Sequence, residues 1–92
     1  MSARREVFLV LNAGSSTLKF ALYEAERLAC LLHGNIEGLG PATETRVAVA
    51  GELSAPFASA PQPEGGDHAA ALGWLLGVLR SSLPDITLAK VL

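Results

Sequence analysis

The spacing of apolar residues in the first third of the sequence constrains the fold most strongly. Residues 7–11 (VFLVL) are a continuous apolar run, which predicts a strand buried on both faces. Residues 17–23 alternate instead, which predicts a strand with one buried face. That face carries Leu18, Phe20 and Leu22. Residues 28–37 predict a third strand, with a bulge or close approach at Gly34. Short links join the three segments, so we expect an antiparallel meander.

The second half of the sequence predicts further strands and one helix. Residues 43–50 are strand-like, and a weaker fifth strand is expected at residues 53–57. Residues 59–67 contain two prolines and two glycines without apolar periodicity, which indicates an internal loop. Asp67 is a suitable N-cap for a helix that runs to about Ser82. One apolar stripe of this helix is suited to lie on a sheet: Leu72, Leu75, Leu76, Leu79 and Leu83.

After this helix, Pro84 stops the helical pattern and residues 86–92 begin another strand. Within the helix, Gly73 and Gly77 form a G-x-x-x-G pair, which we interpret as close packing of the helix on the sheet. Together these elements predict an α/β fold. Its mixed sheet begins with an antiparallel meander and has one covering helix.

The composition is apolar for so short a chain. Half of the 92 residues are hydrophobic and 17% are charged, so we expect some apolar surface to meet a partner or the rest of a longer chain. The net charge of -2 gives no reason to expect nucleic acid or an anionic membrane as a partner. Residues 69–79, the longest apolar run without charge, are too few to span a membrane. No secretory signal pattern is visible at the start, which favours a cytoplasmic protein.

The sequence contains few metal-ligand candidates. Cys30 is the single cysteine, which excludes an internal disulfide, and we expect it to be buried in a strand. His33 and His68 are far apart, and neither has a second ligand at helical spacing. We therefore expect no metal site built from histidine or cysteine.

The polar stretch between the first two strands, residues 12–19 (NAGSSTLK), is the main functional candidate. A turn rich in glycine and hydroxyls exposes backbone N–H groups that suit phosphate oxygens. Gly14 lacks the Cβ that would hold an anion away, and Ser15 and Ser16 can donate further hydrogen bonds. Because successive side chains of a strand point to opposite faces, Thr17 and Lys19 lie on the same face. Spacing alone leaves an ordinary polar hairpin, with the lysine in solvent, as an alternative.

This stretch resembles the amino-terminal signature of the acetate kinase family, in the actin-like, sugar-kinase-like ATPase superfamily. The match is ungapped from Asn12 to Lys19, with VFLVL before it and FALY after it. Residues 34–40 (GNIEGLG) are similar to the end of the family's third strand. Residues 67–72 (DHAAAL) resemble the start of its first helix. The glycine-rich phosphate loops of other nucleotide-binding families do not occur in this chain.

The resemblance implies the opening part of an actin-like (ribonuclease H-like) ATPase lobe, with residues 1–92 as an incomplete first lobe. It implies a Mg²⁺-dependent kinase that moves a phosphoryl group reversibly between ATP and acetate, giving ADP and acetyl phosphate. The parent protein would be a homodimer. The phosphate-binding residues would be Gly14, Ser15, Ser16, Thr17 and Lys19, and Asn12 would assist the metal.

The sequence departs from the family in two respects. Thr17 stands where the family usually has a serine, but the hydroxyl is retained. Family members are also several times longer. Their acyl phosphate-binding and catalytic residues would lie downstream, beginning with a His-Arg-Val-Val-His-Gly-Gly segment soon after Leu92. We therefore expect no catalytic residue within residues 1–92. Two alternatives stay open: a propionate or butyrate kinase, and a non-catalytic module that binds phosphate or a partner.

Overall fold

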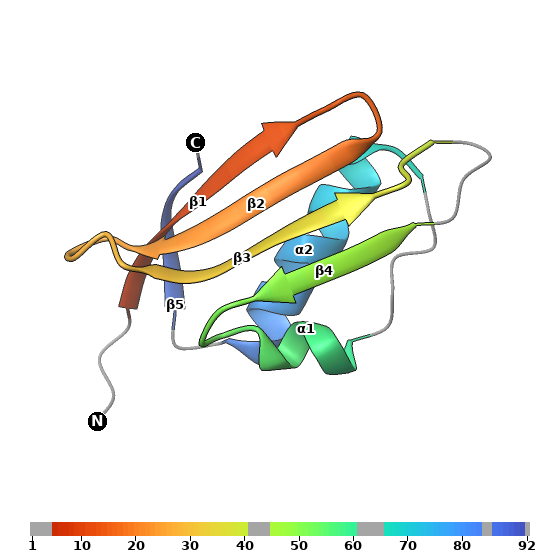
Figure 1. The fold of residues 1–92 in the computed structure, drawn as a ribbon. Coiled ribbons are helices and arrows are strands. Elements are labelled where there is room, and N and C mark those ends of the chain that lie inside the picture. Colours follow the sequence, from red (N-terminus) through yellow and green to blue (C-terminus); the bar gives the residue numbers. More distant parts are fainter. Residues whose placement is uncertain (1–4, 41–44, 61–65, 84–85, 92) are drawn as a thin grey trace.

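The computed structural model describes residues 5–40, 45–60, 66–83 and 86–91, apart from the side chain of Ala89. These residues form one five-stranded sheet in the order β4-β3-β2-β1-β5. The helix α2 (His68–Ser82) lies across one face of the sheet, and the short helix α1 (Ala55–Ser59) lies beside it near the β4 edge (Figure 1). No helix in the described part of the chain is long and apolar enough to cross a lipid bilayer.

The first four strands form the predicted antiparallel meander. They are β1 (Arg5–Ala13), β2 (Thr17–Glu24), β3 (Cys30–Glu37) and β4 (Arg46–Ala50). The expected fourth strand is thus confirmed at residues 46–50, while residues 43 and 44 lie outside the described residues. β5 (Ile86–Val91) returns after α2 and pairs in parallel with β1. The sheet is therefore mixed, as expected.

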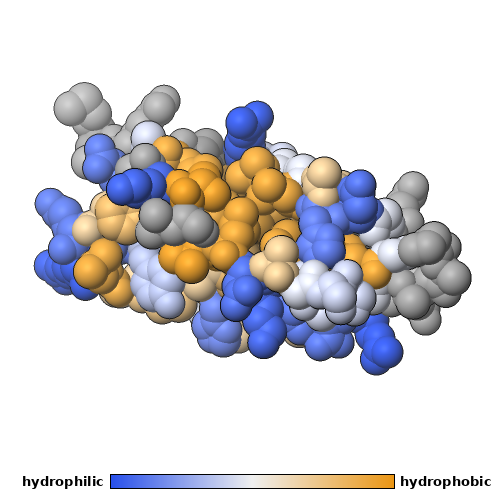
Figure 2. Space-filling model, turned by 90° about the horizontal axis from the view of Figure 1, so that it is seen from above, coloured by the Kyte–Doolittle hydropathy of each residue, from blue (hydrophilic) through white to orange (hydrophobic). Residues whose placement is uncertain are grey.

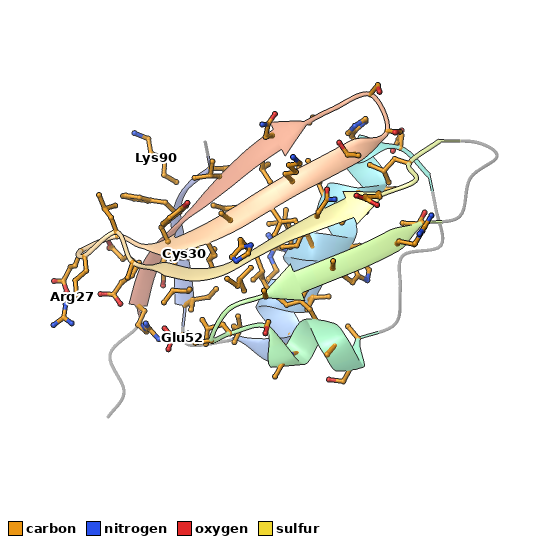
Figure 3. All side chains as sticks on the ribbon, viewed as in Figure 1. Arg27, Cys30, Glu52 and Lys90 are labelled. Atoms are coloured by element: carbon orange, nitrogen blue, oxygen red, sulfur yellow. The ribbon has the colours of Figure 1, made fainter. Side chains whose placement is uncertain are left out.

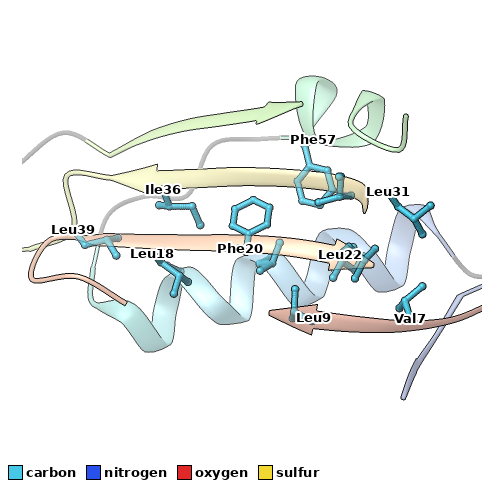
Figure 4. Close-up of a cluster of buried hydrophobic side chains, with 13 residues drawn as sticks. Val7, Leu9, Leu18, Phe20, Leu22, Leu31, Ile36, Leu39 and Phe57 are labelled. Carbon is cyan, nitrogen blue, oxygen red and sulfur yellow. The ribbon is translucent and has the colours of Figure 1, made fainter. Parts of the chain in front are cut away.

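The hydrophobic core fills the space between the sheet and the two helices (Figure 4). Leu18, Phe20 and Leu22 alternate into it from β2, as the sequence pattern predicts. Leu75 and Leu79 enter it from α2, and the other leucines of the predicted stripe are partly buried against it. The helix begins where expected, because the side chain of its N-cap residue Asp67 accepts a hydrogen bond from the Ala70 amide at 2.9 Å.

The strand predicted at residues 53–57 is wrong: this segment leads into α1. Pro56 stands in the first turn of the helix, where its missing N–H costs nothing. In a strand, the same residue would remove a hydrogen bond of the ladder. The helix buries Phe57 between the rings of Phe20 and Trp74, with centroids 6.1 and 5.9 Å away. Aromatic packing thus draws this segment out of the sheet.

Two predictions about the strands need correction. β1 is not buried on both faces within the described residues. Val7 and Leu9 are buried, but Phe8 is only half-buried because both helices lie on one side. Cys30 is exposed, because β3 begins there beside an irregularity in the β2–β3 pairing. The predicted close approach at Gly34 is confirmed, since a Cβ there would lie 2.5 Å from Cζ of Phe20.

The close packing predicted for the glycine pair of α2 is also wrong. Gly73 and Gly77 are exposed, and an added Cβ would have no neighbour within 4 Å at either position. The core-facing stripe of the helix is instead centred on Ala71, Leu75 and Leu79. Because the two glycines lie outside that stripe, they bring no backbone close to the sheet.

The outer side of β5 carries exposed apolar side chains. Leu88 is 38% exposed and Val91 is 51% exposed. Leu88 also lines a hollow between β5 and α2, together with Leu76, Leu79, Arg80, Leu83 and Ile86. Hydrophobic surface gathers in the middle of this side of the molecule (Figure 2). This is the exposed apolar surface that the composition predicts.

Candidate phosphate-binding site

The candidate site is the loop between β1 and β2 together with the side chains at the adjoining strand ends. The strand register places Asn12 directly opposite Lys19. Opposed residues of an antiparallel pair share a face, so these two side chains are neighbours on the face away from α2. Thr17 lies on the same face, two residues before Lys19. The structure thus brings together the amide, the hydroxyl and the ammonium that the sequence predicted as a group.

Gly14 is required by a contact inside the loop. A Cβ at this position would lie 2.5 Å from Oγ1 of Thr17, which is closer than real side chains allow. The absence of a side chain at Gly14 therefore leaves room for the Thr17 hydroxyl above the loop. The sequence argument placed an anion in this space, whereas in the structure the neighbour is the hydroxyl itself.

Two carbonyl groups of the loop accept hydrogen bonds from backbone amides. The Gly14 amide donates to the Thr17 carbonyl at 2.9 Å, and the Leu39 amide donates to the Ser16 carbonyl at 2.9 Å. Within the described residues, the amides of Ser15 and Ser16 donate to no protein acceptor, and both residues are exposed. The loop is therefore an outward-facing group of N–H donors, which is the arrangement that anion-binding loops use.

One residue of this site was missed by sequence reasoning. Nε2 of His68, at the first position of α2, lies 2.6 Å from the Gly14 carbonyl oxygen and 3.0 Å from the Thr17 carbonyl oxygen. The segment 67–72 was recognised only as the start of a helix. His68 is 54 positions from Gly14 and 51 positions from Thr17 in the sequence, so no local pattern signals these contacts.

The charges around the loop favour an anion. Within the described residues Lys19 makes no salt bridge. Arg5 pairs with Glu24 at 3.1 Å and approaches Glu52 to 4.0 Å. Arg27, Cys30 and Glu52 lie at the end of the sheet away from the β1–β2 loop (Figure 3). The ammonium of Lys19 is therefore not neutralised by the ion pairs of the fold.

A third polar residue extends the row formed by Asn12 and Lys19. Asn35 on β3 lies opposite Lys19, and its Nδ2 donates to Glu37 Oε1 at 2.7 Å. Its Oδ1 is buried and has no partner among the described residues. Sequence reasoning identified Asn35 and Glu37 only as part of a strand end. The strand register is what brings Asn35 beside the lysine.

The described residues do not form a complete metal site. They contain no group of three or more His, Cys, Asp or Glu side chains that could hold an ion. Mg²⁺ is usually held by one or two carboxylates together with phosphate oxygens and waters. Asn12 offers an amide but no carboxylate, and its cross-strand neighbour is the cation Lys19. Its NH₂ group can donate to a phosphate oxygen and its amide oxygen can accept from a metal-bound water, which fits Asn12 better than direct ligation of the ion. Its assignment to the metal stays a prediction.

Comparison with known proteins gives matches in sequence and in fold, although no family model matches. Two acetate kinases of Rhodopseudomonas palustris, from strains TIE-1 and ATCC BAA-98 / CGA009, are each 38% identical. Each alignment covers 94% of this chain and 22% of the relative. A propionate kinase structure from Francisella tularensis subsp. tularensis SCHU S4 superposes with a TM-score of 0.64 at 26% identity. This superposition covers 88% of this chain and 20% of that one.

The chain therefore spans about a fifth of the length of the relatives that it matches. The resemblance seen at residues 12–19 is confirmed by both kinds of match. The fold class is confirmed as well: a mixed sheet that begins with an antiparallel meander, as at the start of an actin-like ATPase lobe.

Proposed function

We propose that this chain, which matches the amino-terminal part of acetate and propionate kinases, carries the phosphate-binding hairpin of an acetate kinase. That enzyme transfers the γ-phosphoryl group of ATP to acetate and catalyses the reverse reaction. One observation carries the proposal. Among the residues that the structure describes, the exposed amides of Ser15 and Ser16 donate to no protein acceptor, and the nearby ammonium of Lys19 makes no salt bridge.

Phosphoryl transfer depends mainly on positioning and on stabilising negative charge. In the proposed site, the amides of Ser15 and Ser16 and the hydroxyls of Ser15 and Thr17 donate to phosphoryl oxygens. Lys19 supplies a positive charge at the same face of the hairpin. Asn12 orients a phosphate or a water of the magnesium ion that accompanies the nucleotide. When bound, that ion would neutralise phosphate charge. Gly14 keeps the loop compact beneath the Thr17 hydroxyl.

The identity of the acyl acceptor is the less constrained part of the proposal. The relatives that match in sequence are acetate kinases, and the structural match is a propionate kinase. Acetate is proposed because the sequence identity to the acetate kinases is the higher of the two. A propionate or butyrate kinase is the alternative within the same class.

A non-catalytic module that binds phosphate or a protein partner is the alternative from a different class. The exposed apolar side chains of Leu88 and Val91 favour it, since they would suit a partner surface. In the kinase proposal, the rest of the lobe covers these side chains. The family resemblance further leads us to propose a homodimer for the whole kinase, and we also propose a cytoplasmic location for it.

The test has two parts. The reading frame beyond the codon of Leu92 is sequenced, and we expect a His-Arg-Val-Val-His-Gly-Gly-like segment soon after it. The encoded protein is then assayed for ATP-dependent acyl phosphate, trapped as the hydroxamate, with acetate, propionate and butyrate. We expect the highest kcat/KM with acetate. A preference for a longer acid would favour the alternative kinase. Phosphate binding without turnover on any acid would favour the module.

A further inference from the structure

We infer that His68 is a positioning residue for the phosphate-binding hairpin, and that it sets the direction of the Ser15 amide. This inference rests on the proposed function of the hairpin and adds a residue to it. The evidence is the double contact of Nε2 with the carbonyl oxygens of Gly14 and Thr17, at 2.6 and 3.0 Å.

The chemistry of this contact identifies the donor. Both partners of Nε2 are backbone carbonyl oxygens, which only accept hydrogen bonds. Nε2 of His68 must therefore carry the hydrogen and donate it to the pair. The two carbonyls converge on one ring nitrogen, so the ring closes the base of the loop from the side of α2.

The geometry of the peptide bond carries this restraint to the ligand side. In a trans peptide unit the C=O and the following N–H point in opposite directions. The Gly14 carbonyl belongs to the same peptide unit as the Ser15 amide. Because His68 holds that carbonyl towards the protein, the Ser15 N–H points away from it, and no described residue accepts a hydrogen bond from this N–H. Removing the His68 donor frees this peptide unit to rotate.

Two hydrogen bonds of neighbouring residues fix the position of His68. The N-cap side chain of Asp67 accepts from the Ala70 amide at 2.9 Å, which fixes the first turn of α2. The Gly40 amide donates to the Gly66 carbonyl at 3.1 Å, which ties the segment before α2 to the end of β3. The imidazole thus transmits the position of a packed helix to a loop of small polar residues.

The experiment uses the full-length kinase proposed above and compares His68→Phe with His68→Gln. Phenylalanine keeps a ring but has no donor, whereas the glutamine amide can donate to a carbonyl. Val78→Ala is the matched control, because it removes partly buried atoms from the far half of the same helix without touching the loop. The measurements are the Kd for ATP with Mg²⁺, the KM for the carboxylate, the melting temperature, and amide exchange of the peptide spanning residues 13–18.

We expect His68→Phe to weaken ATP binding by roughly tenfold, which corresponds to about 1.4 kcal/mol. We expect an unchanged KM for the carboxylate, faster exchange of residues 13–18, and partial recovery in His68→Gln. Val78→Ala should lower the melting temperature without changing the Kd for ATP. Wild-type ATP affinity in His68→Phe, or equal loss of affinity in His68→Phe and Val78→Ala, would overturn the inference.

The outcomes also separate this inference from the proposed function. If the wild-type protein binds no nucleotide, the proposed function fails. The amide exchange of residues 13–18 still tests whether His68 orders the loop. Faster exchange confined to His68→Phe would then support a positioning role for His68. Unchanged exchange would overturn it.

Discussion

Two connections of the same meander are held by different groups. In the β2–β3 connection the hydrogen bonds start from backbone amides of the connection, although the amides of Glu26 and Arg27 donate to no acceptor among the described residues. Glu24 N–H donates to the Ala29 carbonyl at 2.9 Å, Ala25 N–H to the Glu6 carbonyl at 2.9 Å, and Leu28 N–H to the Glu24 carbonyl at 2.7 Å. Glu24 is also paired with a charged partner, Arg5.

In the β1–β2 loop, hydrogen bonds instead hold three carbonyls, those of Gly14, Ser16 and Thr17. Within the described residues, the exposed amides of Ser15 and Ser16 donate to no protein acceptor. Reversing the chain needs no such contacts to carbonyls, because within the described residues the carbonyls of residues 25–28 in the β2–β3 connection accept no backbone hydrogen bond of this kind. Held carbonyls with free amides between them support the proposed anion site.

The largest effect is expected when residues 1–92 are expressed alone. They should form no acyl phosphate from ATP, because one hairpin cannot also hold the acceptor in line, and each missing transition-state donor is worth about 2.7–4 kcal/mol. They should also self-associate through β5, the edge strand that exposes Leu88 and Val91. Hydroxamate trapping and sedimentation over a concentration series measure both properties. ATP-dependent turnover, or a stable monomer with a sharp cooperative melt, would contradict this prediction.

In the proposed full-length kinase, Lys19→Ala and Asn12→Ala should each lower kcat/KM by roughly 10²–10³, the effect of losing one preorganised donor. Both residues are exposed, so the melting temperature should change little. The control is Arg27→Ala, which removes an exposed cation from the β2–β3 connection and should leave the kinetics unchanged. Wild-type kcat/KM in both test variants would refute the phosphate-binding role of the hairpin.

Substitutions of Thr17 test how much a single hydroxyl of the β1–β2 hairpin contributes to ATP binding. Thr17→Ser should be nearly silent, because it keeps the hydroxyl. Thr17→Val should lose about 1.5–3 kcal/mol of binding, the value of one hydrogen bond to a charged group. The measurement is the Kd for ATP in the full-length kinase. Equal affinities of the serine and valine variants would show that the hydroxyl has no role.

The smallest effects are expected at two glycines. Gly77→Ala in α2 should stabilise the protein by about 0.8–1.0 kcal/mol, because the position is exposed, helical and open to a Cβ. Gly14→Ala should instead weaken ATP binding several-fold, since its Cβ would displace the Thr17 hydroxyl. Thermal melts and ATP titrations of the two variants test the contrast. Unchanged ATP affinity in Gly14→Ala would mean that the loop adjusts without loss.

The sequence by itself determined the features that depend on local spacing. Period-two alternation identified the buried face of β2, because successive residues of a strand point to opposite sides. Asp67 identified the start of α2, because an N-cap needs only an amide three residues away. The polar loop and its family resemblance could also be recognised, because their residues are contiguous in the sequence. At residues 53–57 the local signal was present in Pro56 but was outweighed by the apolar residues around it.

Only the tertiary structure decided the features that join distant segments. The parallel place of β5 beside β1, the exposure of Gly73 and Gly77, and the contact of His68 with Gly14 all follow from how α2 packs on the sheet. Sequence periodicity states that a helix has an apolar face, but it does not state which loop its first turn will touch. That choice is made by the packing of the whole core, because no residue near His68 in the sequence takes part in the loop that it holds.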